Sequence, residues 1–130
     1  MNYKNNHKVV YHCKYHVVWC PKYQRKVLVD GVEARLKQLI EEICTAHDFD
    51  LFELEIRSNQ VRLLIEVEPQ FGIHKAVKLI KGQTSRILRQ EYAWLCSRLP
   101  SLWTNSYFVS TVEDTPLEAI EEYVQSQKYV

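Results

Sequence analysis

The 130-residue sequence predicts an α+β fold in which helices cover an antiparallel sheet. Two observations lead to this prediction. Segments of alternating apolar and polar residues, which are typical of half-buried strands, appear before, between and after two segments with helical periodicity. The composition, with 46% hydrophobic and 25% charged residues, is that of an ordinary globular chain. We therefore expect residues 1–130 to form a single domain.

Four segments are predicted to be strands. The first places aromatic and β-branched side chains at every second position, and Pro21 ends it because proline cannot donate to a ladder. The second and third are separated by Ser58 and Asn59, a turn signal, so they are predicted to form a hairpin. The predicted strands are residues 10–20, 50–57, 60–67 and 106–112.

Three segments are predicted to be helices. Asp30 is the expected N-cap of the first, and Gly82 interrupts the second, where it predicts a kink or a close approach. The last helix opens on a capping signal, with Thr115 as N-cap, Pro116 in the first turn and Glu118 closing a capping box. The predicted helices are residues 32–46, residues 73–91 and the segment after Thr115.

The resulting element order is β-α-β-β-α-β followed by a further helix. This is the order of the ferredoxin-like arrangement, in which the strands form an antiparallel sheet with helices packed on one face. The sequence therefore predicts a ferredoxin-like βαββαβ domain with an extra C-terminal helix.

The charges are unevenly distributed, although the formal net charge is only +1. Residues 1–29 hold six basic residues and no acidic one, and residues 69–112 hold six basic residues and one acidic one. The segments that follow each of them, residues 30–68 and 113–130, are acidic. Two basic blocks are consistent with a surface that attracts phosphate, and solvated charge on exposed faces is the alternative.

The sequence indicates a cytoplasmic protein. The four cysteines form no CxxC pair, which argues against a zinc ribbon or a thioredoxin-type site and favours free thiols. The chain shows neither an apolar run long enough to span a membrane nor the apolar region of a signal peptide, so we expect no membrane partner.

Tyr123 and Gln127 are the first candidate site residues. Their spacing puts both side chains on one face of the last helix, one turn apart. A tyrosine hydroxyl can attack phosphorus and hold a DNA end as a phosphotyrosine, provided that the developing charge is neutralised. A tyrosine on an amphipathic helix more often serves packing, so the pair alone does not decide between these roles.

Longer motifs resemble the single-tyrosine HUH transposases of bacterial insertion sequences. The resemblance covers nearly the whole chain in order. It rests on YHVVWCPKYQRKVL from Tyr15 to Leu28, EPQFG from Glu68 to Gly72, KGQTSR from Lys81 to Arg86, LWTNSYF from Leu102 to Phe108, and EYVQSQ from Glu122 to Gln127.

The resemblance implies a ferredoxin-like homodimer that binds single-stranded DNA folded into a hairpin. It implies that Tyr123 is the nucleophile of DNA cleavage, that a His-hydrophobic-His motif on a central strand binds Mg²⁺ or Mn²⁺, and that Gln127 is the third ligand. It also implies that the last strands and helix form the dimer surface.

The central metal motif departs from the family pattern. Where that pattern runs Asp-His-hydrophobic-His-hydrophobic-Leu, this chain has NQVRLL from Asn59 to Leu64, so Gln60 and Arg62 replace both histidines. A neutral amide is a weak ligand, and a guanidinium has no acceptor and stays protonated. We therefore expect no bound metal and impaired cleavage.

Other histidines are not expected to restore a metal site. His12 and His16 lie four residues apart on the first strand, which separates them by about 13 Å. His47 and His74 fall near helix ends. These side chains are expected to be surface or half-buried histidines.

Two interpretations of Arg62 follow. It can contact a DNA phosphate directly in place of the metal, so that binding persists without cleavage. Alternatively, the position has drifted in a decayed transposon copy. The two corresponding function classes are an insertion-sequence transposase, active or inactivated, and a non-enzymatic DNA-binding protein such as a repressor or a competitor of active transposase. A ferredoxin-like module that binds a small molecule or peptide is the third alternative.

Basic and aromatic side chains are the candidate DNA contacts, because Lys and Arg bind phosphates and aromatic rings stack on unpaired bases. Trp19, Trp94 and Trp103 are instead expected in the core or a dimer surface. The candidates, besides Arg62, are Lys22, Tyr23, Arg25 and Lys26 after the first strand, and Lys75, Lys78, Lys81, Arg86 and Arg89 on the second helix.

Overall fold

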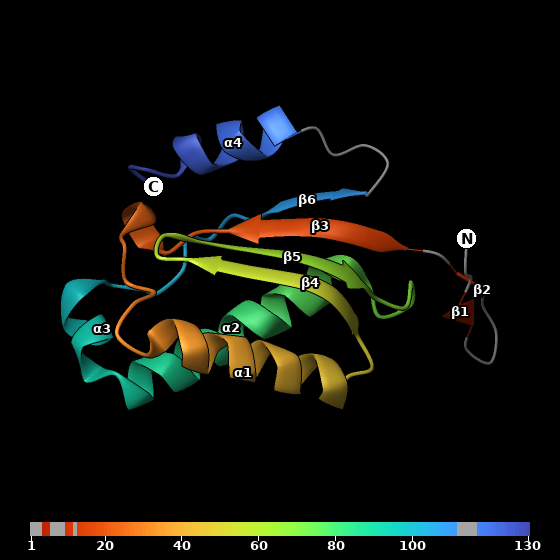
Figure 1. The fold of residues 1–130 in the computed structure, drawn as a ribbon, viewed down its shortest axis with the longest axis horizontal. Coiled ribbons are helices and arrows are strands. Elements are labelled where there is room, and N and C mark those ends of the chain that lie inside the picture. The colour runs from red at the N-terminus through yellow and green to blue at the C-terminus, as the bar shows by residue number, and fades with distance from the viewer. Residues whose placement is uncertain (1–3, 6–9, 12, 112–116) are drawn as a thin grey trace.

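The computed structural model describes residues 4–5, 10–11, 13–111 and 117–130 as three layers (Figure 1). A sheet lies in the middle, α1 and α2 cover one face, and α4 lies on the other. The elements are β1 (Lys4–Asn5), β2 (Val10–Tyr11), β3 (Lys14–Trp19), a short 3₁₀ helix η1 (Lys22–Gln24), α1 (Val32–Ala46), β4 (Asp50–Arg57), β5 (Gln60–Glu66), α2 (Ile73–Glu91), α3 (Ala93–Arg98), β6 (Phe108–Thr111) and α4 (Leu117–Ser126).

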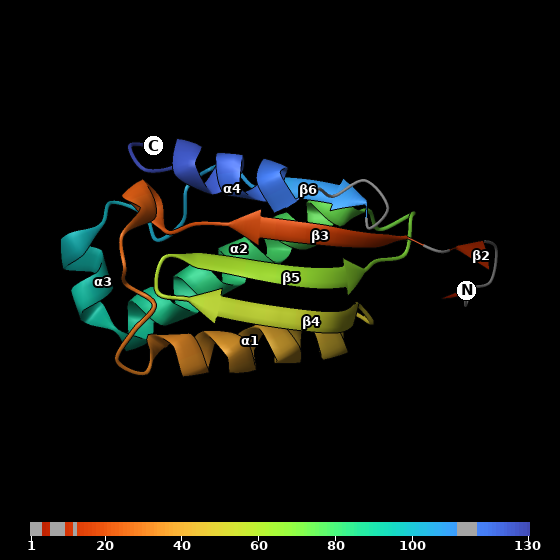
Figure 2. The same cartoon turned by 45° about the horizontal axis from the view of Figure 1, so that its top comes forward.

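The main sheet has four strands in the order β4-β5-β3-β6, and every neighbouring pair is antiparallel. This confirms the predicted α+β architecture with its four-stranded antiparallel sheet. Val18 of β3 lies opposite Arg62 on β5 and opposite Phe108 on β6, so these three side chains share the face that α4 covers. Figure 2, turned toward this face, shows α4 running along β6 and β3.

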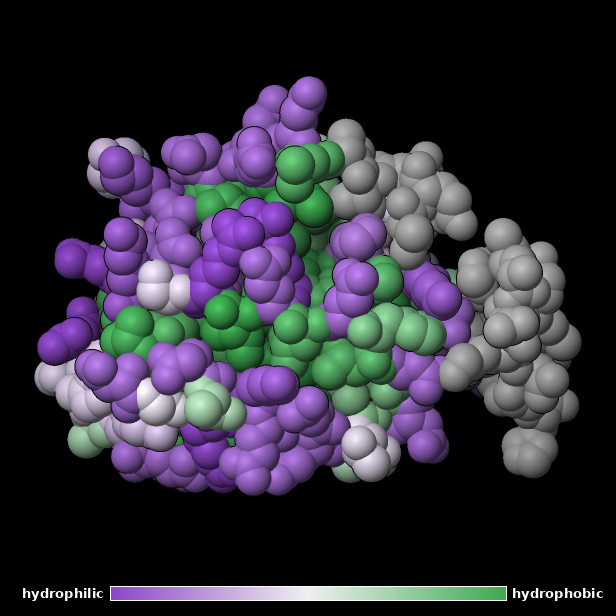
Figure 3. Space-filling model, in the orientation of Figure 1, coloured by the Kyte–Doolittle hydropathy of each residue, from purple (hydrophilic) through white to green (hydrophobic). Residues whose placement is uncertain are grey.

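The main core fills the space between the sheet and the two long helices. Its largest fully buried side chains include Trp19, Ile40, Ile80 and Leu88, and each such aliphatic side chain stabilises the fold by roughly 1.5–3 kcal/mol. Trp103 is also buried and meets Trp19 edge-on, with ring centroids 5.9 Å apart, as expected of core tryptophans. In Figure 3, hydrophobic residues are visible beneath α4 and along the middle of the same side of the molecule, with hydrophilic residues above and below.

The predicted strands and helices lie close to the observed ones, with differences at their ends. The predicted strand 10–20 is divided into β2, which pairs with β1, and β3, which belongs to the main sheet. β6 spans Phe108–Thr111 rather than starting at residue 106. The short helix α3 was not predicted, because its six residues are too few to show helical periodicity.

Two predictions about helix ends and interruptions are wrong. Gly31, with a φ of 96°, is the N-cap of α1 in place of Asp30, whose own φ of 56° places it in the left-handed region. Gly82 lies within the continuous helix α2, and no atom beyond the neighbouring helix backbone lies within 4 Å of the position that a Cβ would occupy, so no other described segment approaches it closely. The predicted capping residues Thr115 and Pro116 fall outside the described residues.

Candidate functional site

A small apolar cluster fixes α4 on the sheet. Ile120 and Val124, one helical turn apart, are both 7% exposed and pack against Val18 and Cys20 at the end of β3. The half-buried rings of Phe108 and Tyr123 border this cluster, with centroids 6.0 Å apart. The same periodicity therefore places Tyr123 and Gln127 on the inner side of α4.

Ser106 joins the two predicted site residues of α4. Its hydroxyl donates to Oε1 of Gln127 at 2.7 Å and lies 3.0 Å from the hydroxyl of Tyr123. A serine hydroxyl has one proton, which Gln127 receives here, so Tyr123 is the donor to Ser106. The Nε2 of Gln127 donates in turn to Ser126 at 2.9 Å. Both amide atoms of Gln127 are therefore engaged.

Burial keeps Tyr123 in its protonated form. Desolvation raises the pKa of its phenol, and the Coulombic effect of Cys20 adds to this rise. The side chains of Ser106 and Thr104 lower the pKa, because their hydroxyls hydrogen-bond to the deprotonated phenol, but they do not reverse the direction. Tyr123 is therefore a neutral hydrogen-bond donor at neutral pH, and attack on phosphorus requires removal of its proton.

Lys81 lies inside the molecule rather than on the exposed face predicted for it. Its side chain is 8% exposed, and Nζ donates to the carbonyl oxygens of Thr104 at 2.7 Å and of Ser106 at 2.9 Å. Burial lowers the pKa of Lys81 to about 8, because the charged amine loses its water. In this position Lys81 contacts the segment that carries Ser106.

Gln60 and Arg62 form a pair on β5. Nε of Arg62 donates to Oε1 of Gln60 at 2.6 Å, with Gln60 buried and Arg62 half-buried. Both line a groove of about 870 Å³ between the β4–β5 hairpin and α4, together with Arg57. The opposite wall carries three glutamates of α4, Glu118, Glu121 and Glu122.

The structure brings Tyr123 and Gln127 together but does not place them on this groove, whose α4 wall also includes Val124, Gln125 and Ser126. Tyr123 belongs instead to the neighbouring side of α4, which faces Ser106 and Phe108. Burial raises the pKa of the Cys20 thiol to about 11, and the positive charges of Lys81 and Arg62 partly offset this rise.

The residues at the family's metal positions do not fit a divalent cation. Oε1 of Gln60 accepts from Arg62, and Oε1 of Gln127 accepts from Ser106, so each amide oxygen already has a hydrogen-bond donor. The Arg62 guanidinium adds a fixed positive charge beside Gln60. Within residues 13–111 and 117–130 there is also no group of three or more His, Cys, Asp or Glu side chains arranged to hold a metal.

The histidines named from the sequence lie apart from this site. His47 caps the end of α1 and bonds to the Ile43 carbonyl at 3.1 Å. His74 bonds to the Tyr107 hydroxyl at 3.0 Å near the start of α2. His16 lines a smaller cavity of about 280 Å³ beside Arg62, and His12 falls outside the described residues.

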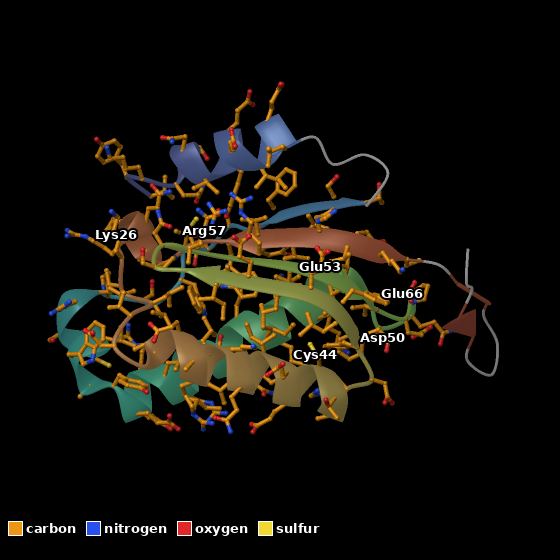
Figure 4. The ribbon with its side chains drawn as sticks, viewed as in Figure 1. Lys26, Cys44, Asp50, Glu53, Arg57 and Glu66 are labelled. Atoms are coloured by element: carbon orange, nitrogen blue, oxygen red, sulfur yellow. The ribbon has the colours of Figure 1, made fainter. Side chains whose placement is uncertain are left out.

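The first group of predicted DNA contacts lies at the end of α4 that carries Gln127. The backbone N–H of Tyr23 donates to the carbonyl of Val130 at 3.1 Å, which fixes η1 beside this end. Arg25 and Lys26 are exposed there, and Lys22 lies over the Tyr23 ring. Figure 4 shows Lys26 and Arg57 at this same end of the sheet.

The second group is distributed along α2, on the far side of the sheet from α4. Lys75, Lys78 and Arg86 are exposed, whereas Arg89 is half-buried and donates to the Leu99 carbonyl at 3.1 Å. The two groups of candidate contacts therefore lie apart, the first at one end of the sheet and the second on the helix α2 that covers one of its faces. Trp94, half-buried beneath Arg98, is the one predicted core tryptophan that borders the surface.

Two residues of this region, Arg57 and Ser106, were not among the predicted site residues. Arg57 lies directly opposite Gln60 in the hairpin register, and the predicted turn at Ser58 and Asn59 carried enough information to place it there. Ser106 lies at the start of the predicted strand 106–112 and within the LWTNSYF motif, but neither pattern indicates its contact with Tyr123.

Comparison with known proteins connects this arrangement to DNA transposition. The family model described as "Transposase IS200 like" matches residues 9–127. The ISDra2 transposase TnpA of Deinococcus radiodurans is 32% identical over 126 residues, covering 95% of this chain and 90% of that protein. The transposase for insertion sequence element IS200 of Salmonella typhimurium is 24% identical over 119 residues. The match covers 90% of this chain and 78% of the Salmonella protein.

Solved structures give the same result for the fold. A crystal structure of a candidate transposase from Deinococcus radiodurans R1 superposes with a TM-score of 0.87 and 33% identity, covering 98% of this chain and 99% of that one. A REP-associated tyrosine transposase, solved with a REP hairpin, shares the fold at a TM-score of 0.54 and 9% identity. The match covers 95% of this chain and 70% of that one. No helix in the described part of the chain is long and apolar enough to cross a membrane. The family match over residues 9–127 and the full-length similarity to transposases show that this chain belongs to the IS200-like transposase family.

Proposed function

We propose that this transposase-family chain binds hairpin-forming single-stranded DNA as a homodimer and needs no metal to do so. The observation that carries this proposal is the clustering of Arg25, Lys26, Arg57 and Arg62 around the end of the sheet where Tyr123 and Gln127 lie. Basic side chains at such an end supply phosphate contacts, which dominate affinity for nucleic acid. The REP-associated relative, which shares the fold, is bound to a DNA hairpin and supports a hairpin as the ligand.

Arg62 replaces the metal in this proposal. Its Nε donates to Gln60, and the residue lines the groove, so we expect the rest of the guanidinium to donate to a phosphate. A cation held by the protein attracts phosphate but does not activate Tyr123, whose phenol stays protonated. DNA binding therefore persists, while metal-dependent cleavage by Tyr123 is lost or slow.

The same observation supports the second candidate function, a non-enzymatic DNA-binding protein that acts as a repressor or as a competitor of active transposase. The pairing of Arg62 with Gln60 supports this candidate, because a fixed positive charge beside Gln60 disfavours a metal cation and attracts phosphate. We place either protein in the cytoplasm, where the DNA of a bacterial insertion sequence is found. Covalent attachment of DNA to Tyr123 distinguishes the two functions.

The binding proposal is tested by fluorescence anisotropy with a labelled hairpin-bearing oligonucleotide in EDTA. We expect binding without metal, with an affinity that falls as salt rises, by about 0.7 log unit per log unit of salt for each phosphate contacted on a single strand. The double variant Arg25→Ala/Lys26→Ala should reduce this slope. Lys37→Ala, an exposed lysine on α1, is the matched control and should not change it. Binding that requires Mn²⁺ would contradict the proposal.

Assembly and cleavage are measured separately. Light scattering at micromolar concentration should give the mass of a dimer, and a monomer would remove the homodimer from the proposal. Incubation with hairpin DNA and Mn²⁺, followed by denaturing electrophoresis, should give no protein–DNA adduct. An adduct that disappears in Tyr123→Phe would show that the protein is an active transposase despite Gln60 and Arg62.

A further inference from the structure

Lys81 is a buried cation outside the proposed DNA surface. It belongs to α2, whose lysines Lys75 and Lys78 are exposed, yet its own side chain is 8% exposed. Both of its hydrogen-bond acceptors are neutral backbone carbonyls rather than carboxylates. Burying an ammonium group without an opposite charge is costly, so a packing role alone does not explain a lysine at this position.

The two carbonyls belong to a short segment that the sheet itself does not hold. Thr104 and Ser106 precede β6, which begins at Phe108. The N–H of Thr104 donates to the carbonyl of Cys20 at 3.1 Å, which attaches one end of the segment to β3. At the other end, the Ser106 carbonyl accepts from Lys81 at 2.9 Å and from the Thr104 hydroxyl at 3.3 Å. Lys81 thus contributes the shorter of these two contacts.

The Ser106 side chain points toward α4 and the residue that follows it, Gln127. Its hydroxyl accepts from Tyr123 and donates to Gln127, as its single proton requires. The position of that hydroxyl depends on the backbone at Ser106, which lies outside the β3–β6 ladder. The contacts therefore run from Lys81 through the backbone of Ser106 to the phenol of Tyr123.

We propose that Lys81 is a positioning residue, which holds the Thr104–Ser106 backbone so that the Ser106 hydroxyl stays between Tyr123 and Gln127. Lys81 acts through the two carbonyls and does not touch DNA. Any effect of Lys81 on the reaction of Tyr123 with DNA rests on the proposed function. The positioning of Ser106 by Lys81 does not depend on it. The Gln60 and Arg62 pair takes no part in this arrangement.

Nuclear magnetic resonance of protein labelled with ¹³Cζ-tyrosine tests this proposal without DNA. The Tyr123 signal is assigned by its loss in Tyr123→Phe. Ser106→Ala removes the acceptor of the phenol and should shift the signal. Lys81→Met, which keeps an unbranched side chain but no donor, should shift it in the same direction. Lys78→Met, an exposed lysine one turn away on the same helix, should leave it unchanged.

The outcomes separate positioning from mere stability. If Lys81→Met lowers the melting temperature while the Tyr123 signal stays at its wild-type position, Lys81 is only structural and the proposal is wrong. If Lys81→Met does not fold, the wild-type protein gives the answer through the ¹⁵Nζ signal of Lys81, whose protons should exchange slowly with water. Exchange as fast as that of Lys78 would also overturn the proposal. Neither measurement depends on DNA binding, so failure of the proposed function is seen separately.

Discussion

The two faces of the sheet are built from different kinds of contact. On the face covered by α1 and α2, a continuous apolar core includes Trp19, Ile40 and Leu88, each of them fully buried. On the face covered by α4, only Ile120 and Val124 of the helix are buried against β3. Much of the rest of that face consists of hydrogen-bonded polar side chains, among them the pair of Gln60 and Arg62 and the cluster around Ser106.

The difference means that the residues that stabilise the fold and the residues of the candidate site lie on different faces of the sheet. Apolar packing on the α1 and α2 face supplies most of the stabilising burial, because stabilisation follows the apolar area removed from water. The polar contacts of the α4 face contribute less net stability, since each replaces hydrogen bonds with water. Exchange of a few polar side chains on the α4 face can therefore change the chemistry of the protein while its fold is retained.

The double variant Gln60→His/Arg62→His should show the largest functional change. It removes the guanidinium and supplies two imidazole ligands on one strand, so Mn²⁺ should bind stoichiometrically with a micromolar Kd in calorimetric titration. The wild-type protein should give no heat of binding in the same range. Either single variant should bind more weakly, because such a site needs several ligands to hold its geometry.

The same double variant also tests whether the two faces are independent. Its free energy of unfolding, measured by urea denaturation, should stay within about 1 kcal/mol of the wild-type value, as is usual for polar exchanges outside the core. With hairpin DNA and Mn²⁺, an adduct that requires Tyr123 would show that only the metal site was lost. Absence of an adduct despite Mn²⁺ binding would favour a binding-only role.

The contrast between the faces also explains which parts of the structure could be predicted from sequence. The helices α1 and α2 pack on the sheet through apolar residues at helical spacing. This periodicity is visible in the sequence, so the bounds of α1 and α2 were predicted to the residue. The hairpin of β4 and β5 followed from alternation and a turn signal. The cap at Gly31 was missed because a left-handed φ at Asp30 and Gly31 is not visible in hydrophobic periodicity.

The candidate site was predicted only in part. Tyr123 and Gln127 lie four residues apart on one helix, so their proximity to each other follows from helical periodicity. The burial of Lys81 did not follow, because lysines on an amphipathic helix are normally exposed. Its acceptors lie more than 20 residues away in the sequence, and contacts of that kind have no local signal.

Core substitutions should show the next largest effect. Ile40→Ala on the α1 side should lower the free energy of unfolding by about 2–5 kcal/mol, because it leaves a cavity in a closely packed core. Val124→Ala on the α4 side should cost only about 1.5 kcal/mol, the value of the two methyl groups removed. Urea denaturation followed by circular dichroism measures both variants. Equal losses would show that α4 is as firmly integrated as α1.

Arg62→Ala should weaken binding of hairpin DNA by about tenfold, which corresponds to one charge-assisted hydrogen bond of about 1.5 kcal/mol. Anisotropy in EDTA measures this change, and Arg62→Lys, which keeps the charge, should recover part of it. An unchanged affinity would indicate that position 62 has drifted and that the groove does not contact phosphate. Glu121→Gln on the opposite wall should strengthen binding slightly, because it removes a negative charge from the groove.

Tyr123→Phe should have the smallest effect on affinity. The substitution removes the hydroxyl that donates to Ser106 but keeps the ring that packs beside Phe108, so α4 should stay in place. Affinity for hairpin DNA in EDTA should remain within about twofold of the wild-type value, since no phosphate contact with a charged group is lost. Ser106→Ala is a second comparison, because it removes the same hydrogen bond from the other side together with the one to Gln127. A large loss of affinity in Tyr123→Phe alone would mean that the phenol itself contacts DNA, which requires α4 to present Tyr123 differently from the position that Ser106 gives it here.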